Sequence, residues 1–128
     1  MDTNKLMLQP DVKHPIEIKP NSSRVVVKVA GQVIADTRDA LTLTEAAYAP
    51  VQYIPRKDVK MELLERSDNA TYCPYKGDAA YYSIPSGGQN STNAVWTYEH
   101  PYDAVAEIKE CLAFYPTRVD TIDVTSAV

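Results

Sequence analysis

The segment Cys73-Pro74-Tyr75-Lys76-Gly77 brings a thiol, a phenol and a cation together in a turn-forming sequence. If the turn folds the Lys76 ammonium toward Cys73, the cation would stabilise a thiolate, and Cys73 could act as a nucleophile or a redox thiol. Lys76 could instead anchor a carboxylate or a phosphate, because Gly77 lets a ligand approach the backbone. A buried structural cysteine and a solvated turn lysine are the non-functional alternatives. The sequence therefore predicts a candidate site and leaves its chemistry open.

The cysteines and histidines of the chain do not form a metal or dithiol motif. Lys76 occupies the place of the second cysteine in a Cys-Pro-Tyr-Cys redox motif, and strand-like residues follow where a thioredoxin-type fold requires a helix. No Cys-x-x-Cys pair is present to hold zinc, and Cys111 belongs to an apolar helical pattern that indicates the core. His14 and His100 each precede a proline in polar surroundings, so we expect them to be structural or solvated. We expect no metal and no cofactor.

Aromatic side chains could provide the walls of a pocket near this segment. Trp96 and Tyr98 are two residues apart and face the same side of one predicted strand. Tyr53, in a strand bracketed by prolines, could join them, as could Tyr75, and Arg56 could help Lys76 to hold an anionic group. Such a cluster can stack a planar ring or cage a cation, although an aromatic core would have the same pattern.

The composition predicts a single globular domain without a nucleic-acid or membrane partner. Hydrophobic residues make up 45% of the 128 residues and charged residues 23%, which suffices for one core. The net charge of −4 argues against phosphate neutralisation by clustered cations. No apolar run approaches the ~20 residues that span a bilayer, and Met1 to Val12 lacks the pattern of a secretory signal. We expect a cytoplasmic protein, whose oligomeric state the sequence does not predict.

Short β-branched segments alternate with turns, which predicts one mostly β domain over residues 16–122. Residues 1–15 are expected to form a flexible lead-in, and residues 123–128 a tail. Strands are expected near residues 16–18, 24–29, 32–37, 41–45, 51–54, 60–66, 70–73, 79–84, 93–99 and 118–122.

Two local elements have distinct signals. Arg24–Val29 and Gln32–Thr37 predict a hairpin, with Gly31 supplying a positive φ at its two-residue turn. Asp103–Cys111 predicts the single C-terminal helix, because apolar residues recur on one face and Asp103 can serve as its N-cap.

Several phrases of the sequence form a recognisable series. They are Arg24-Val25 with Gly31, Val33-Ile34-Ala35-Asp36, Tyr53-Ile54-Pro55-Arg56-Lys57-Asp58-Val59, Cys73-Pro74-Tyr75-Lys76-Gly77-Asp78-Ala79, Ala94-Val95-Trp96-Thr97-Tyr98, and Ala113-Phe114-Tyr115 before Val119-Asp120. In this order, and over about His14 to Asp123, the series resembles the bacterial domain-of-unknown-function family 427 (DUF427), which is sometimes labelled nucleotidyltransferase-like. The resemblance implies a small antiparallel two-sheet β-tent (Mss4-like) domain, in which two sheets lean together at one edge and a pocket opens between them.

The nucleotidyltransferase label finds no support in the residues. Metal-dependent nucleotidyl transfer uses carboxylates spaced to hold magnesium, usually an Asp-x-Asp pair behind a glycine-rich turn. Asp36 and Asp39 are three residues apart, as are Asp120 and Asp123, and no phosphate-loop lysine follows Gly87-Gly88.

Three hypotheses about function follow. The leading one is a small-molecule binding domain, with an anionic or aromatic ligand held by Lys76 and Gly77 between aromatic walls. The second is an enzyme that uses Cys73 as a nucleophile or redox thiol. The third is a protein interaction module without a small ligand, which requires a filled interior between the sheets.

Overall fold

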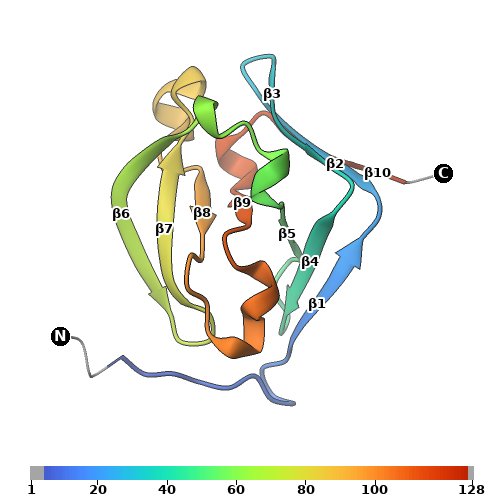
Figure 1. Ribbon diagram of the computed structural model, residues 1–128, viewed down its shortest axis with the longest axis vertical. Helices are drawn as coiled ribbons and strands as arrows, with labels where there is room; N and C mark the ends of the chain where they lie inside the picture. The colour runs from blue at the N-terminus through green and yellow to red at the C-terminus, as the bar shows by residue number, and fades with distance from the viewer. Residues whose placement is uncertain (1–4, 127–128) are drawn as a thin grey trace.

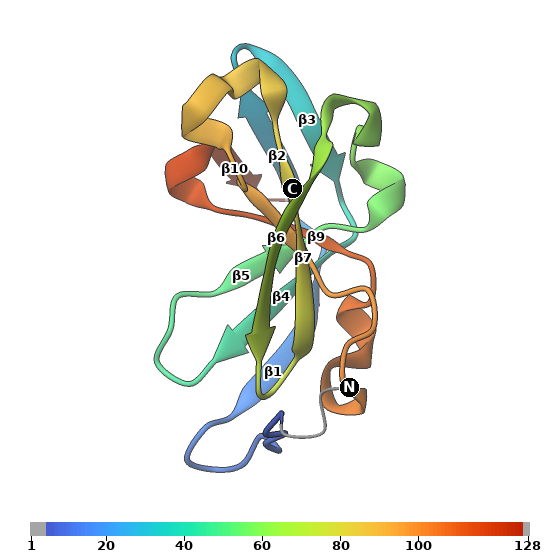
Figure 2. The same cartoon turned by 90° about the vertical axis from the view of Figure 1, so that its left-hand side faces the viewer.

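Residues 5–126 form three antiparallel β-sheets joined by loops and short 3-10 turns in the computed structural model (Figures 1 and 2). Sheet A has the strand order β1 (Ile16–Asn21), β4 (Ala40–Glu45), β5 (Val51–Tyr53). Sheet B has the order β10 (Thr121–Thr125), β2 (Arg24–Val29), β3 (Gln32–Thr37). Sheet C has the order β6 (Glu65–Cys73), β7 (Gly77–Ser83), β8 (Val95–Thr97), β9 (Leu112–Phe114). The mostly β class is confirmed, but three sheets replace the expected two.

The third sheet arises because the chain leaves sheet A for sheet B and later returns. After β1, the side-chain oxygen of Asn21 accepts a hydrogen bond from the Ser23 amide at 3.0 Å, which forms a local turn into β2. On the way back, the Thr37 hydroxyl accepts a hydrogen bond from the Asp39 amide at 2.9 Å, just before β4. Two side-chain-capped turns thus divide the consecutive strands between two sheets.

The β2–β3 hairpin is confirmed. Its turn residues Ala30 and Gly31 have φ angles of 52° and 77°, so both central positions are left-handed, as a tight hairpin turn of this kind requires. Val25, Val27 and Val29 alternate along β2 and are buried, which fixes the register of the hairpin against the core.

The prediction of one continuous C-terminal helix is wrong. Asp103–Ile108 forms two short 3-10 turns with a non-helical Val105 between them, at φ −127° and ψ 30°. Tyr102, not Asp103, precedes the first turn, and no side chain caps it. Val105 and Ile108 are nevertheless buried. The apolar pattern identified the buried side chains and could not distinguish the two helix types.

Other boundaries also differ from the prediction. Met61–Leu63 is a 3-10 turn rather than part of a strand, and β6 begins only at Glu65. β10 continues to Thr125, so part of the predicted tail pairs with β2. The remaining 3-10 segments are Arg56–Asp58, Pro85–Ser91 and Pro116–Arg118.

The N-terminal segment runs along one end of the sheets (Figure 1). The Leu8 amide donates to the Pro74 carbonyl at 2.9 Å, and the Tyr72 hydroxyl donates to the Leu6 carbonyl at 2.7 Å. Leu6 and Leu8 of the predicted lead-in are therefore bonded to the β6–β7 hairpin. Residues 1–4 and 127–128 of the predicted lead-in and tail lie outside the described residues.

Within residues 5–126, the backbones of sheets A and C are hydrogen-bonded to each other at one bridge. Ile54, just after β5, and Leu112, at the start of β9, exchange two backbone hydrogen bonds of 2.8 Å. On one side of this junction an aliphatic core packs against sheet B, and on the other side the apolar cluster is rich in tyrosine. No helix in residues 5–126 has the length and apolar composition needed to cross a membrane.

Candidate functional site

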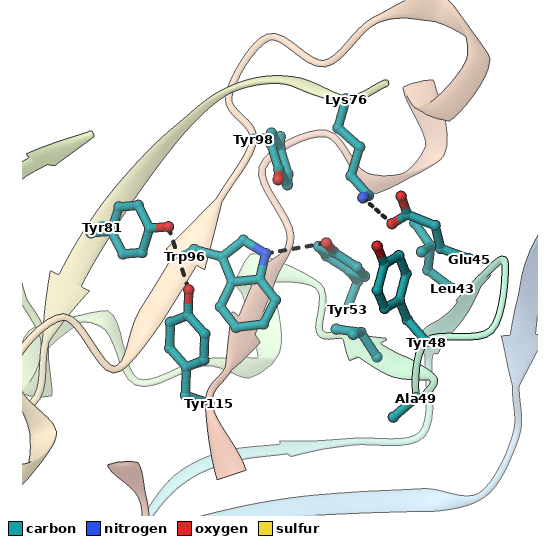
Figure 3. Close-up of a pocket in the computed structure, with 11 residues that line it drawn as sticks. Leu43, Glu45, Tyr48, Ala49, Tyr53, Lys76, Tyr81, Trp96, Tyr98 and Tyr115 are labelled. Atoms are coloured by element: carbon teal, nitrogen blue, oxygen red, sulfur yellow. Dashed lines mark hydrogen bonds and ion pairs between the residues drawn. The ribbon is translucent and has the colours of Figure 1, made fainter. Parts of the chain in front are cut away.

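A cavity of about 230 Å³ lies between sheets A and C (Figure 3). Sheet A and the β4–β5 loop supply one wall, and sheet C with the residue after β9 supplies the other. The lining residues are Leu43, Glu45, Tyr48, Ala49, Val51, Tyr53, Lys76, Tyr81, Trp96, Tyr98 and Tyr115. The structure thus brings together Lys76, Tyr53, Trp96 and Tyr98 from the predicted set.

Lys76 forms the charged end of the cavity. The tight turn between β6 and β7 directs its side chain inward, and the residue is only 7% exposed. Its ammonium is ion-paired with the carboxylate of Glu45, and it lies 3.8 Å from the Cys73 sulfur. The turn therefore folds the cation toward the thiol, but Glu45 already neutralises its charge.

Glu45 is a site residue that the sequence prediction missed. Its second carboxylate oxygen lies 2.7 Å from His14 Nε2, and the His14 ring stacks on Tyr75 with centroids 4.1 Å apart and planes 5° from parallel. Burial alone would raise the pKa of Glu45, but the hydrogen bonds from Lys76 and His14 outweigh it and hold that pKa below its ordinary value. His14 is thus a partner in the site rather than a solvated residue, and Tyr75 supports it outside the cavity.

A signal for Glu45 was present in the sequence. Leu41, Leu43 and Glu45 alternate along β4, so Glu45 lies on the same face as two leucines. A carboxylate on the apolar face of a strand requires a cation or hydrogen-bond donors. The identity of the donors depends on long-range pairing, which no local pattern contains.

The aromatic walls are connected by hydrogen bonds. Trp96 Nε1 donates to the Tyr53 hydroxyl at 3.2 Å, and the two rings meet edge to face at an angle of 89°. The Tyr115 ring lies 4.5 Å from the Trp96 ring, and its hydroxyl is 3.4 Å from that of Tyr81. Burial and the Tyr81 contact raise the pKa of Tyr115 to about 12. These contacts hold the indole of Trp96 in a fixed orientation at the cavity wall.

Three phenol groups point toward the charged end. Figure 3 draws the hydroxyl groups of Tyr48, Tyr53 and Tyr98 on the same side of the cavity as the Lys76 ammonium. Burial raises the pKa of Tyr53 and of Tyr98, so both remain protonated and can donate hydrogen bonds. The cavity therefore combines an amine, a carboxylate and neutral phenols, which is a set of donors and acceptors with balanced charge.

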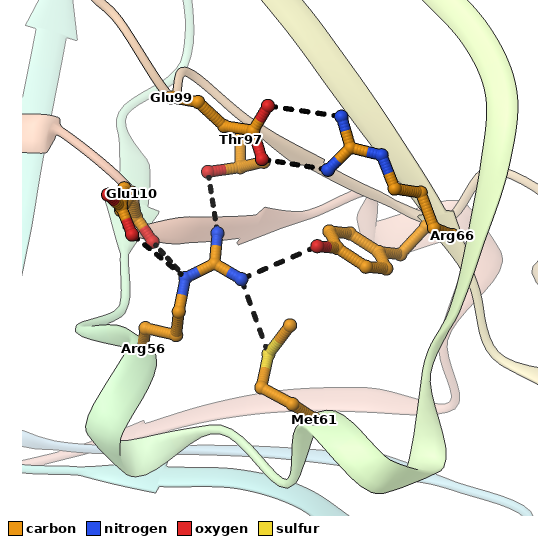
Figure 4. Close-up of polar contacts among 7 residues, drawn as sticks. Arg56, Met61, Arg66, Thr97, Glu99 and Glu110 are labelled. Carbon is orange, nitrogen blue, oxygen red and sulfur yellow. Dashed lines mark hydrogen bonds and ion pairs between the residues drawn. The ribbon is translucent and has the colours of Figure 1, made fainter.

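Arg56 lies outside the cavity, contrary to the predicted role in holding an anion there. Its guanidinium contacts the Thr97 hydroxyl at 3.5 Å and the Glu110 carbonyl at 3.2 Å (Figure 4). Because Thr97 follows Trp96 on β8, their side chains face opposite sides of sheet C. The bidentate pair of Arg66 with Glu99, at 2.7 and 3.0 Å, lies on the Arg56 side.

Gly77 also has a role different from the one predicted. Its φ angle is 109°, and a Cβ atom there would lie 3.4 Å from the His100 carbonyl oxygen. The adjacent Lys76 carbonyl accepts a hydrogen bond from the Tyr102 amide at 3.0 Å. Glycine is therefore required at this turn for its positive φ, and Gly77 does not line the cavity.

The arrangement is suited to hydrogen bonding and stacking. Within residues 5–126, no three His, Cys, Asp or Glu side chains gather closely enough to hold a metal ion. Cys73 is half-buried and packs against the tyrosine-rich cluster, next to the cavity but not among its lining residues.

The fold and the site define a mostly β domain in which two sheets enclose an aromatic cavity closed by a lysine–glutamate pair. The chain belongs to the family described as "Domain of unknown function (DUF427)", whose model matches residues 17–125. The matched region contains every residue that lines the cavity, whereas His14 precedes it. A search of curated proteins found no match to the chain.

Proposed function

We propose that the protein binds a small planar molecule without net charge in the cavity between sheets A and C. The observation that carries this proposal is the cavity itself, with aromatic walls and a charge-compensated polar end. Its volume of about 230 Å³ exceeds the ~150 Å³ that admits a benzene ring and is below the ~300 Å³ at which drug-sized sites begin. A ligand of one or two rings fits this space.

An anionic or an aromatic ligand is expected from the sequence. The Lys76–Glu45 pair favours a neutral aromatic ligand over an anionic one. An anion at Lys76 would have to displace Glu45 or lie beside its negative charge, which is unfavourable in a partly buried site. A lysine ammonium has three N–H donors, and Glu45 and Cys73 account for two of the contacts, so one donor is left for a neutral carbonyl or ring nitrogen.

Two further features belong to the proposal. Sheets A and C act as the leaning walls of a tent-type arrangement, supported by the Ile54–Leu112 junction between them. A cytoplasmic location is supported by the free thiols of Cys73 and Cys111. The hypothesis of an interaction module requires a filled interior between the sheets, so the cavity supports ligand binding in preference to it.

A fluorescence titration tests the proposal directly, because Trp96 is the only tryptophan and lines the cavity. Adenine, uracil and methyl 4-hydroxybenzoate serve as neutral planar probes, with benzoate and inorganic phosphate as anionic comparators. We expect saturable changes in Trp96 emission with a Kd below about 1 mM for at least one neutral probe. The proposal fails if no neutral probe binds, or if the anions bind more tightly.

Two alanines of one loop provide a matched pair of variants. Ala49 lines the cavity, whereas Ala47, also exposed, does not. Ala49→Leu should weaken binding of the neutral probe by about tenfold, because the added atoms occupy ligand space. Ala47→Leu should leave the affinity unchanged, and equal effects of the two substitutions would argue against binding in the cavity.

Catalysis by Cys73 is a second candidate, favoured by the 3.8 Å contact between its sulfur and the Lys76 ammonium. The test is the rate of alkylation by iodoacetamide, followed at each cysteine by mass spectrometry. A catalytic thiol should react faster than free cysteine and lose this advantage in Lys76→Met. Cys111 is the internal control, because its burial raises its pKa and should keep it slow. A Cys73 rate no faster than that of free cysteine removes this candidate.

A further inference from the structure

A second hollow of about 350 Å³, here called the apolar groove, adjoins the cavity and has no role in the proposed function. Its floor contains the buried side chains of Val27, Ile54 and Phe114. Its rim contains the half-buried Ile122 and Val124, which is 50% exposed. The groove thus presents aliphatic and aromatic surface that is partly open to water.

The apolar groove lies between two edge strands. β5 is the last strand of sheet A, and β10 is an outer strand of sheet B. Ile122 and Val124 pair with Val27 and Val25 of β2, so all four side chains lie on one face of sheet B. That face is buried at β2 but only partly covered at β10. The uncovered part is the wall of the groove.

The groove and the cavity are neighbours that share two wall residues. Val51 and Trp96 line both of them. The same loop borders both, since Tyr48 and Ala49 line the cavity and Pro50 lines the groove. A ligand that reaches from the cavity into the groove would pass these shared residues. The polar groups of Lys76 would then lie at one end of it and the apolar floor at the other.

We propose that the ligand is amphipathic, with a planar polar head in the cavity and an alkyl tail in the apolar groove. This inference rests on the proposed function, because the head occupies the same cavity. The occupant of the groove is the tail of that small molecule, since the groove adjoins the cavity at the shared residues Val51 and Trp96. Transfer of the tail from water onto the apolar floor supplies the affinity.

Alkyl esters of 4-hydroxybenzoic acid test the inference, because the methyl, butyl and heptyl esters keep one head and lengthen the tail. Binding to the full chain is followed by Trp96 fluorescence and by calorimetry. Complete burial of one methylene tightens binding by up to about fourfold. For a partly open groove we expect the butyl ester to bind at least about tenfold more tightly than the methyl ester.

Neighbouring residues of β10 provide the matched variants. Val124→Asp places a charge on the groove rim, whereas Thr125→Asp places the same charge on the next residue, which faces the other side of the sheet. Val124→Asp should abolish the gain in affinity that the longer tail gives, and it should leave the affinity for the methyl ester unchanged. Thr125→Asp should preserve the gain in affinity. Thermal unfolding confirms that both variants are folded, as expected for exposed positions.

The outcomes separate this inference from the proposed function. Equal affinity for all the esters would overturn the proposal that the tail binds in the groove. Equal effects of Val124→Asp and Thr125→Asp would overturn it as well. Neither result would contradict binding of the head in the cavity. If adenine or uracil binds and no ester does, the inference about the tail is overturned and the proposed function is not. Failure of all the neutral probes and all the esters overturns both proposals.

Discussion

Lys76 and Glu45 form an ion pair across two sheets, since Lys76 comes from the β6–β7 turn of sheet C and Glu45 ends β4 of sheet A. Their side chains are only 9% and 15% exposed. The pair closes one end of the cavity and connects its two walls at that end. His14 extends the connection to the N-terminal segment. A change at this pair should therefore affect both the stability of the fold and the shape of the site.

Lys76→Met tests the energetic role of the pair. Removing one partner of a buried pair costs about 3–5 kcal/mol, and the partial exposure of Glu45 and its bond to His14 reduce the expected loss to about 1–3 kcal/mol. The measurement is the free energy of unfolding in urea. The double variant Lys76→Met/Glu45→Leu should recover to within about 1 kcal/mol of the wild type, because an apolar pair needs no compensation.

Lys57 provides the control for a surface pair. It bonds to Asp39 and Asp58 with its side chain 64% exposed, so Lys57→Met should leave the unfolding midpoint close to that of the wild type. If Lys76→Met were equally neutral, the Lys76–Glu45 pair would not contribute to the folded state in solution.

Acid should weaken the fold in part through Glu45. The pKa of Glu45 in the folded protein lies below its ordinary value of 4.5, so its ionisation stabilises the fold above that pH. This contribution is lost as the pH falls through the lower, folded-state value. The pKa values of Asp36, Asp58 and Glu99 are also lowered, so they add to the same loss.

Glu45→Gln isolates the contribution of Glu45 to acid sensitivity. The variant should be less stable than the wild type at neutral pH, and its free energy of unfolding should fall less steeply below pH 4.5. Urea unfolding at a series of pH values measures the difference between the two curves. Parallel curves would show that ionised Glu45 does not stabilise the folded state.

The features that the sequence indicates are those that depend on local spacing. The β2–β3 hairpin follows from the β-branched segment Arg24–Val29 and the two-residue turn with Gly31 after it. Trp96 and Tyr98 line one cavity because residues two apart in an extended segment share a face. Lys76 reaches Cys73 because a tight turn brings together residues three apart. In each case the partners are neighbours in the chain.

The features that the sequence did not predict depend on packing between distant segments. Glu45 meets Lys76 and His14, each 31 residues away, through the approach of sheet A to the β6–β7 turn. Arg56 was assigned to the cavity on residue type, but β8 separates it from Trp96. The division into sheets A and B depends on the path through Asn21 and Thr37, and a strand pattern does not specify which strands share a sheet.

Alkaline pH should destabilise the fold through two buried phenols. Burial raises the pKa of Tyr53 and of Tyr98 above the ordinary value of 10.0, so the folded state retains protons that the unfolded state releases. The stabilisation by these neutral phenols is complete below pH 10 and declines as the pH rises above it.

Tyr98→Phe and Tyr53→Phe should each make the decline above pH 10 less steep. Tyr53→Phe also removes the acceptor of the Trp96 indole N–H, so it should lower the free energy of unfolding by about 1 kcal/mol at neutral pH. Unfolding free energies measured on both sides of pH 10 separate the two effects. An unchanged slope in both variants would mean that these phenols ionise equally easily in the folded and unfolded states.

Gly77→Ala tests whether the turn that carries Lys76 depends on glycine. The φ angle of 109° is strained for alanine, which costs about 1–3 kcal/mol, and the new methyl group would lie 3.4 Å from the His100 carbonyl oxygen. Gly31→Ala is the comparison, because Gly31 also has a positive φ, of 77°, but no atom lies within 4 Å of its added carbon. We expect Gly77→Ala to lower the free energy of unfolding more than Gly31→Ala does. It should also change the emission of Trp96, because a turn that relaxes the strained φ would move Lys76 in the cavity. Equal losses without a change in emission would show that the φ of Gly77 does not position Lys76 in the cavity.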